Sequence, residues 1–138
     1  MKRVVLLFAA AYAAFAVVGV VARPVEAARP GDTRDQADCV FSGTVKAVYA
    51  RDTTGYRQYV VEIGIEQVAK GAGLNKGDTF RAFCYQRKAG AGGLEFDTAG
   101  HNAIPREGQR IRAFVKSGRG RNEGVYPDWF DVIRATNR

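Results

Sequence analysis

An alternation of apolar and polar residues, repeated in several segments, is the feature of this sequence that most constrains its fold. In the segment Cys39–Tyr49, the side chains of Phe41, Val45 and Tyr49 would share one face, whereas Lys46 would lie on the other. A period of two is that of a half-buried β-strand, not of an amphipathic helix. Comparable segments follow at residues 56–68, 79–86, 109–116 and 125–133. The pattern therefore predicts five strands and an all-β fold.

Glycines mark the expected turns and bends. Residues 89–93, Ala-Gly-Ala-Gly-Gly, do not favour a helix or strand, because each internal glycine costs about 0.5 to 1 kcal/mol. We therefore predict a long flexible loop within residues 87–108, with at most one short helix. Two expected strands also contain glycines, which suit the bends of strongly coiled strands in a small barrel. We predict one domain at residues 38–135, a five-stranded Greek-key barrel of the OB-like (oligonucleotide/oligosaccharide-binding) type.

The N-terminus predicts export. Lys2 and Arg3 precede the 19-residue uncharged run Val4–Ala22, and Val25-Glu26-Ala27 offers small residues at the −3 and −1 positions of a signal-peptidase site. We predict that residues 1–27 are a cleaved secretory signal peptide and that residues 28–37 form a flexible leader. The mature protein would then be secreted or periplasmic, with no integral membrane segment. Because the run is also long enough to span a membrane, the protein would be membrane-anchored without cleavage.

The two cysteines are interpreted in the light of export. An oxidising compartment favours a disulfide between Cys39 and Cys84, which the chain-entropy model values at about 4 kcal/mol. A zinc site is not expected, because two cysteines and one histidine fall short of four ligands. The alternative to the disulfide is a pair of buried free thiols. We expect no metal and no cofactor.

Three short segments carry a resemblance to a known family. Residues 39–45 read Cys-Val-Phe-Ser-Gly-Thr-Val, residues 59–63 Tyr-Val-Val-Glu-Ile and residues 68–71 Val-Ala-Lys-Gly, while residues 105–115 read Pro-Arg-Glu-Gly-Gln-Arg-Ile-Arg-Ala-Phe-Val. Over roughly residues 38–116 the chain resembles the netrin-module and tissue-inhibitor-of-metalloproteinase-like family. The resemblance implies an OB-type barrel with a disulfide. It does not imply metalloproteinase inhibition, because the family's inhibitors begin with a cysteine, and here Ala28 would be first.

The sequence contains no recognisable catalytic constellation. The one histidine, His101, falls in the expected flexible loop and is predicted to be a solvated residue. Neither Ser42 nor Ser117 lies in a nucleophile motif, and Asp128 and Asp131 would point to opposite faces of a regular strand. A small hydrolase using Asp128, Asp131 or His101 is therefore the least favoured of the functions considered.

Arginine and aromatic residues coincide on the outward faces of two expected strands. With 21 Lys plus Arg against 14 Asp plus Glu, the chain carries a net charge of +7. Alternating cationic and aromatic groups on a barrel face can hold anionic or sugar ligands. We predict a ligand-binding face on neighbouring strands, formed by Arg81, Phe83, Tyr85, Arg110, Arg112 and Phe114.

The expected partners follow from this charge and from export. They are a polyanion, a cell-envelope polysaccharide or another secreted protein, whereas export disfavours nucleic acid. The alternative is that the cationic rows are a solvated structural surface. The protein would then be a structural or inhibitor-like envelope protein, with the glycine-rich segment of residues 89–100 as its contact element.

Overall fold

The computed structural model describes residues 31–88, 99–118 and 120–136, so the predicted signal peptide and residues 89–98 of the expected loop lie outside the described part. No described segment is a helix with the length and apolarity needed to cross a membrane. A 3₁₀ turn, η1 (Arg34–Gln36), precedes six strands: β1 (Cys39–Asp52), β2 (Tyr56–Lys70), β3 (Thr79–Arg87), β4 (Arg110–Ser117), β5 (Asn122–Gly124) and β6 (Phe130–Val132).

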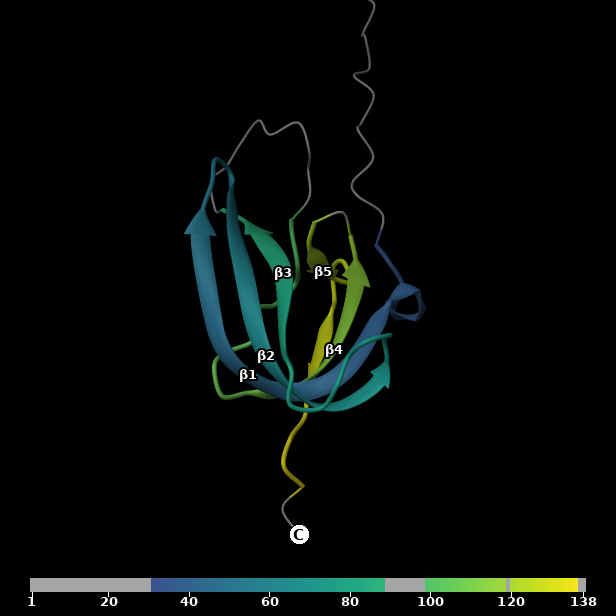
Figure 1. The fold of residues 1–138 in the computed structure, drawn as a ribbon. Helices are drawn as coiled ribbons and strands as arrows, with labels where there is room; N and C mark the ends of the chain where they lie inside the picture. Colours follow the sequence, from purple (N-terminus) through teal and green to yellow (C-terminus); the bar gives the residue numbers. More distant parts are fainter. Residues whose placement is uncertain (1–30, 89–98, 119, 137–138) are drawn as a thin grey trace, which may run out of the picture.

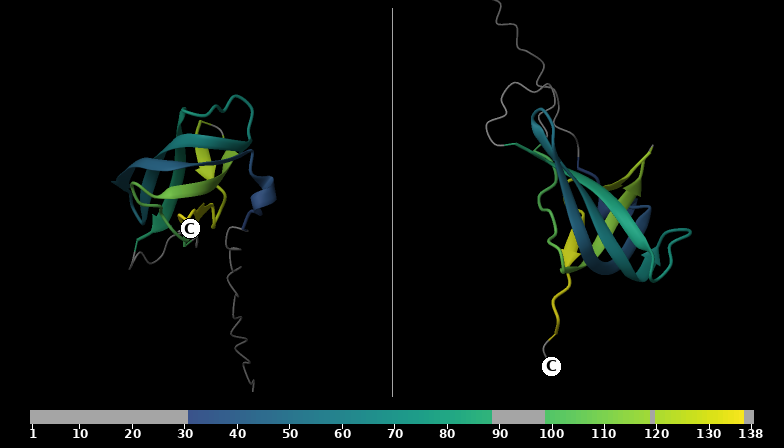
Figure 2. Two further views of the ribbon diagram at one scale, coloured as in Figure 1. Left: turned by 90° about the horizontal axis from the view of Figure 1, so that it is seen from below. Right: turned by 60° about the vertical axis from the view of Figure 1, so that its left-hand side comes forward.

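Five of these strands close into a barrel. Their order is β1-β2-β3-β5-β4, and β4 pairs back onto β1 (Figure 1). The β3–β5 pairing is parallel and the others are antiparallel. β5 and β6 lie along the same edge of β4, at different positions. Two further views show the strands wrapping around a common interior (Figure 2). The predicted all-β, OB-like barrel is therefore confirmed, with β6 as an additional strand.

The two halves of β1 differ in the strands with which they pair. Residues 40–44 pair with both β2 and β4, whereas residues 45–52 of β1 pair with β2 alone. Where the strand bends, Gly43 lies so close to β2 that a Cβ atom there would collide with the carbonyl oxygen of Gly64. Glycine inside this strand therefore permits the close crossing that a coiled barrel strand needs.

The interior is filled by the inward-facing residues of all five barrel strands. Phe41 and Phe80 meet from opposite walls with ring centroids 4.7 Å apart, and Trp129 is fully buried with its Nε1 donating to the carbonyl of Ala103 at 3.3 Å. The alternation seen in the sequence predicts the other inward residues correctly, including Val45, Val61, Ile63, Ile65, Ala82, Ile111, Ala113 and Val115.

Tyr49 is an exception to this pattern. It was expected on the core face with Val45, but its exposed fraction is 57%. The register of β1 against β2 passes from Val45–Ile63 to Ala47–Glu62, so Lys46 is an extra residue at a bulge. A bulge reverses the inside–outside phase of everything that follows it in the strand. Val48 consequently packs against the core and Tyr49 points outward.

The predicted last strand, residues 125–133, is mostly irregular. Only Phe130–Val132 forms a strand, and the connection expected to be a turn contains β5 instead. Val125, Tyr126 and Trp129 are all buried, a spacing that no regular strand produces. Pro127 between them has no N–H to donate to a neighbouring strand. Which side chains are buried in this segment is therefore determined by packing in the core and not by the period of two of a regular strand.

The described part of the expected leader, residues 31–37, is packed onto the barrel. Arg34 is bonded to the carboxylate of Asp131 at 2.7 Å, and Ala37 is fully buried. The backbone is tied at two further points, because Asp32 N–H donates to the Tyr126 carbonyl and Asp38 N–H donates to the Val115 carbonyl. Residues 31–37, which the sequence predicts to be part of a flexible leader, are therefore attached to the barrel in this structure.

The predicted Cys39–Cys84 disulfide does not form in this structure, since both thiols are free. Both side chains point inward as expected, with exposed fractions of 8% and 0%. However, Cys39 pairs with Val115 of β4, whereas Cys84 lies on β3. β2 lies between β1 and β3 on one side of the barrel, β4 and β5 lie between them on the other, and the two cysteines are not within disulfide distance.

Candidate binding surfaces

The structure separates the two predicted rows of site residues. Arg81, Phe83 and Tyr85 alternate with buried residues on β3, and Arg110, Arg112 and Phe114 do the same on β4, so the predicted outward phase is correct for both rows. The two strands are not neighbours, however, because β5 lies between them. The single face expected from the sequence is therefore two surfaces.

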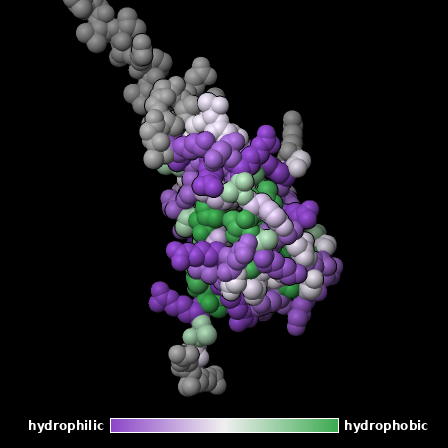
Figure 3. Space-filling model, turned by 90° about the vertical axis from the view of Figure 1, so that its left-hand side faces the viewer, coloured by the Kyte–Doolittle hydropathy of each residue, from purple (hydrophilic) through white to green (hydrophobic). Residues whose placement is uncertain are grey.

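The first surface is centred on Phe83. Two hollows, of about 210 and 300 Å³, lie on either side of it and have Phe83 and Val60 as common lining residues. We term the pair the Phe83 groove. Its outward-facing side chains come from β1, β2, β3 and the β4–β5 connection, namely Tyr49, Arg51, Gln58, Val60, Arg81, Phe83 and Arg121. Figure 3, which faces the β1–β2 side of the barrel, shows apolar surface bordered by hydrophilic side chains.

The groove is cationic. The guanidinium of Arg121 lies 3.8 Å from the centre of the Phe83 ring, and that of Arg51 has no ion-pair partner among the described residues. Arg81 is bonded to Glu62 at 3.0 Å. None of the described residues lining the two hollows is acidic. An anion entering the groove would therefore meet arginines without facing a lining carboxylate.

Glu62 lies beside this surface and moderates its charge. It accepts hydrogen bonds from Arg81 Nε at 3.0 Å and from the Tyr49 hydroxyl at 3.1 Å. These hydrogen bonds, the one from Arg81 first, lower the pKa of Glu62. The carboxylate thus stays ionised and partly neutralises Arg81.

Tyr85, the third predicted member of the β3 row, has a structural environment. Its ring makes edge contacts with Tyr56 and His101, at centroid distances of 5.7 and 5.1 Å, and stacks with Tyr126 at 6.3 Å. This aromatic cluster joins β3 to the segments around residues 101 and 126. Tyr85 therefore anchors one end of the groove rather than lining either hollow.

His101 is buried, with an exposed fraction of 2%. The prediction that it is a solvated residue is therefore wrong. Its Nδ1 lies 3.2 Å from the backbone nitrogen of Tyr85 and its Nε2 lies 2.9 Å from the carbonyl oxygen of Gly124. A neutral imidazole with its proton on Nε2 satisfies both partners. His101 thereby links β3 to β5, and its enclosure removes it from the candidates for a general base. The residues around it were judged only by their loop-like composition, which does not report burial.

In the second row, Arg110 is occupied by an ion pair. Its Nε is 2.6 Å from Glu66, which also accepts a 2.6 Å hydrogen bond from the Thr44 hydroxyl. The hydrogen bonds from Thr44 and Arg110 lower the pKa of Glu66. Arg110 therefore joins β4 to β2 across β1 and lines neither of the surfaces described here.

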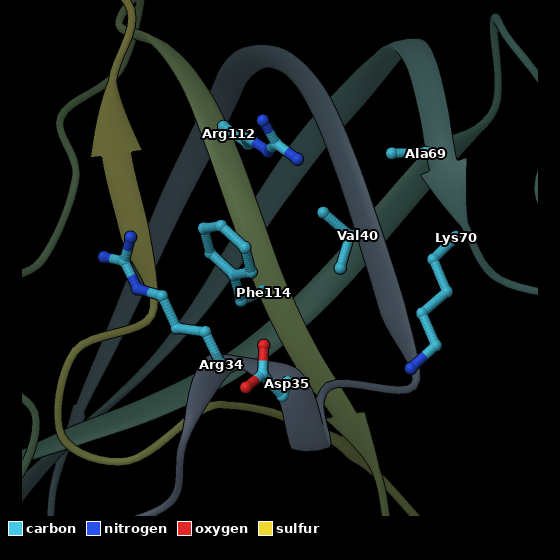
Figure 4. A pocket seen from close by; sticks show the side chains of 7 residues that line it. All are labelled: Arg34, Asp35, Val40, Ala69, Lys70, Arg112 and Phe114. Atoms are coloured by element: carbon cyan, nitrogen blue, oxygen red, sulfur yellow. The ribbon is translucent and has the colours of Figure 1, made fainter.

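The other two residues of that row line a third hollow, of about 370 Å³, which forms the second surface (Figure 4). We term it the Arg112 pocket, lined by Arg34, Asp35, Val40, Lys70, Arg112 and Phe114. The Phe114 ring lies between two guanidinium groups, with Arg34 at 4.5 Å and Arg112 at 5.6 Å from its centre. η1 thus forms one wall of the pocket and β1 and β4 form its floor.

The charge of Arg34 is largely neutralised. It donates to Asp131 at 2.7 and 3.1 Å and to Asp128 at 3.3 Å. The hydrogen bond with Asp131 raises the pKa of Arg34. Asp128 and Asp131 were considered in the sequence as hydrolase carboxylates on opposite faces. The irregular backbone before β6 instead brings both to one arginine, so they hold η1 in place.

Several surface residues were not singled out from the sequence. Tyr49 was assigned to the core because the bulge at Lys46 leaves no clear signal in the alternation. Arg121 and Arg34 lie in segments that were interpreted only as a turn and a leader. In each case the contact that matters, with Phe83 or with Phe114, joins residues far apart in the chain.

Comparison with known proteins finds no matching family model, no matching curated protein and no matching solved structure.

Proposed function

We propose that this protein is an exported binding module whose Phe83 groove binds an acidic polysaccharide. The observation that carries the proposal is the pairing of Arg121 with the Phe83 ring at 3.8 Å, between two hollows whose lining, among the described residues, contains arginines but no carboxylate. A sugar ring can pack its apolar face on an aromatic side chain, while guanidinium groups bind its carboxylate or sulfate groups with charge-assisted hydrogen bonds.

The position of the groove supports the same proposal. It lies across the outer faces of β2 and β3 and reaches the β4–β5 connection, and OB-type barrels bind oligonucleotides and oligosaccharides on this side. The export inferred from residues 1–27 favours the polysaccharide of these two classes. The resemblance to the netrin-module family adds a further proposal, that the chain is a distant secreted relative with an interaction role.

Two adjacent hollows also suit a linear ligand. Tyr49 and Arg51 line one of them, and Arg81 and Arg121 line the other. Each hollow thus has cationic side chains of its own, and the two are joined at Phe83 and Val60. A chain of at least two acidic sugar units would engage both sets of arginines at once.

The test compares retention on immobilised heparin for two double variants with the same change in net charge. Replacing Arg51 and Arg121 with glutamine removes two groove cations, and we expect the affinity to fall by at least about 100-fold, since hydrogen bonds to charged groups contribute about 1.5 to 3 kcal/mol each. The matched control replaces Lys76 and Arg106, exposed cations that line neither hollow. It should lower the affinity by less than about threefold, because distant surface charges are screened.

A third variant separates stacking from charge. Phe83→Ala should weaken binding even at high salt, where the Coulombic attraction is screened but the packing of a sugar on the ring is not. Equal losses in the two double variants would mean that net charge alone retains the protein. That result would overturn the groove as a site and would leave the arginine rows as a solvated structural surface.

A further inference from the structure

The Arg112 pocket presents two opposite charges that the protein itself does not neutralise. Arg112 has no ion pair or hydrogen bond through its guanidinium with any described residue, and the carboxylate of Asp35 likewise has no ion-pair partner there. Arg34, in contrast, is held by Asp131 and Asp128. The charges available to a ligand are therefore the guanidinium of Arg112 on β4, the ammonium of Lys70 at the end of β2 and a carboxylate on η1.

An apolar surface separates Arg112 from Asp35. Figure 4 shows Arg112 and Asp35 on opposite sides of Phe114 and Val40. Arg112 and Phe114 are two residues apart on β4, about 7 Å at the usual rise of a strand, and Asp35 lies beyond Phe114. A ligand that reached both charges would have its own charges at its two ends and an apolar middle.

We propose that the Arg112 pocket binds a short zwitterionic peptide in an extended conformation. Its terminal carboxylate would accept hydrogen bonds from Arg112, and its terminal ammonium would donate to Asp35. An extended tripeptide spans about 10 Å, more than the roughly 7 Å between residues 112 and 114 of β4, so it can extend past Phe114 toward Asp35, and its apolar side chains would pack on Phe114 and Val40. The volume of about 370 Å³ is within the range of small-molecule sites.

Other classes of ligand fit this pocket less well. A polyanion would meet the carboxylate of Asp35, and a cation would meet Arg112 and Lys70. Lys70 already donates to the carbonyl of Ala37 at 2.5 Å, but its charge adds to that of Arg112. With two cations against one carboxylate, the terminal carboxylate of the peptide contributes more to binding than its ammonium.

This inference does not depend on the proposed polysaccharide groove. The two surfaces have no lining residue in common, and β5 lies between β3 and β4. A failure of one proposal would leave the other unaffected, and the variants used for each are different.

The experiment is a titration of the isotope-labelled mature protein with trivaline, followed by amide chemical-shift changes. We expect saturable shifts in η1 and β4 with a Kd of about 1 mM or tighter. Asp35→Asn should weaken the binding of trivaline about tenfold, the effect of losing one charged hydrogen bond. N-acetyl-trivaline, which lacks the ammonium, should bind the Asp35→Asn variant and the unchanged protein equally.

The opposite end of the peptide is tested in the same way. The Arg112→Gln substitution should weaken the binding of trivaline more than tenfold. The variant should bind trivaline amide, which lacks the terminal carboxylate, with the same affinity as the unchanged protein. Arg110→Gln is the matched control, because Arg110 is exposed on the same strand and lies outside the pocket. Either of two results would overturn the proposal: no saturable shift at about 10 mM trivaline, or equal affinity for the free and acetylated peptides.

Discussion

The Phe83 groove and the Arg112 pocket are built from the same pair of residue types but offer a ligand different charges. In both, a guanidinium lies over a phenylalanine ring, Arg121 over Phe83 at 3.8 Å and Arg34 over Phe114 at 4.5 Å. Arg34 is held by two aspartates, with the shortest contact at 2.7 Å, whereas the nearest carboxylate to Arg121 is that of Glu123 at 3.8 Å. Whether an arginine is available to a ligand therefore depends on the carboxylates packed across from it.

The two surfaces are nevertheless joined by one strand. The first half of β1 contributes Val40 to the pocket, and its second half contributes Tyr49 and Arg51 to the groove. The bend at Gly43 and the bulge at Lys46 lie between these halves. Strand continuity therefore couples the stability of the two surfaces, even though their ligands would not compete.

The largest expected effect tests this coupling. Gly43→Ala would place a methyl group against the Gly64 carbonyl, and we expect the free energy of unfolding to fall by about 3 kcal/mol, as for strong overpacking. Urea unfolding followed by the fluorescence of Trp129, the one tryptophan, measures the change. Both surfaces should lose their ligands together as the barrel opens.

Gly31→Ala is the control for that substitution. A Cβ at Gly31 would lie 3.5 Å from Pro127 Cδ, an ordinary contact, so its stability should change by less than about 0.5 kcal/mol. If Gly43→Ala were as stable as this control, the close crossing of β1 and β2 would not be needed for closure. The two surfaces would then have to be treated as independent.

A smaller effect is expected from Arg34→Ala, which removes the contact between η1 and the segment leading into β6. The lost hydrogen bonds to Asp131 and Asp128 should reduce stability by about 1 kcal/mol. Heparin retention through the groove should be unchanged, whereas peptide binding in the Arg112 pocket should weaken. Thermal unfolding and the two binding assays check these outcomes.

Arg57→Ala provides the matched control for Arg34. Arg57 is paired with Asp52 at 3.5 Å, and both side chains are more than half exposed, so the pair should contribute almost nothing to stability. Similar losses from both variants would show that the attachment of η1 is no stronger than an ordinary surface ion pair.

The smallest effect concerns the acidic neighbour of the groove. Glu62→Gln leaves Arg81 without its carboxylate, so heparin affinity should rise about two- to threefold, the size expected of an exposed pair. Glu66→Gln makes the same change in the Arg110 pair, outside the groove, and should have little effect. A rise of the same size in both variants would indicate that the groove is not where heparin binds.

The pH dependence of heparin affinity compares the groove with Glu62 ionised and with Glu62 neutral, without a mutation. Since Arg81 and Tyr49 lower the pKa of Glu62 below its usual 4.5, this carboxylate is protonated only at more acidic pH. Sulfate groups stay ionised there, so the affinity of the unchanged protein should rise as the pH falls through the lowered pKa. The Glu62→Gln variant should lack that rise. The stabilising Glu62–Arg81 pair, fully present above pH 4.5, is lost over the same interval.

Much of the barrel could be predicted because alternation is a local property. A strand with one buried face repeats its pattern every two residues, and this gave the inward side chains of β3 and β4 and the outward phase of both arginine rows. The prediction failed where the inside–outside phase of a strand changes, or the strand is interrupted, without a change in composition. The extra residue Lys46 reverses the phase at Tyr49, and the buried Val125, Tyr126 and Trp129 interrupt the last strand.

What the sequence alone determined is therefore the all-β character, the cationic surface and the side of each strand that faces the core. Only the tertiary structure decided which strands are neighbours. β5 separates the two arginine rows, and Asp131 meets Arg34 from 97 residues away. The physical reason is that burial follows from the side chains of one segment, whereas the partner of a charge depends on which distant segment the closed barrel brings opposite it.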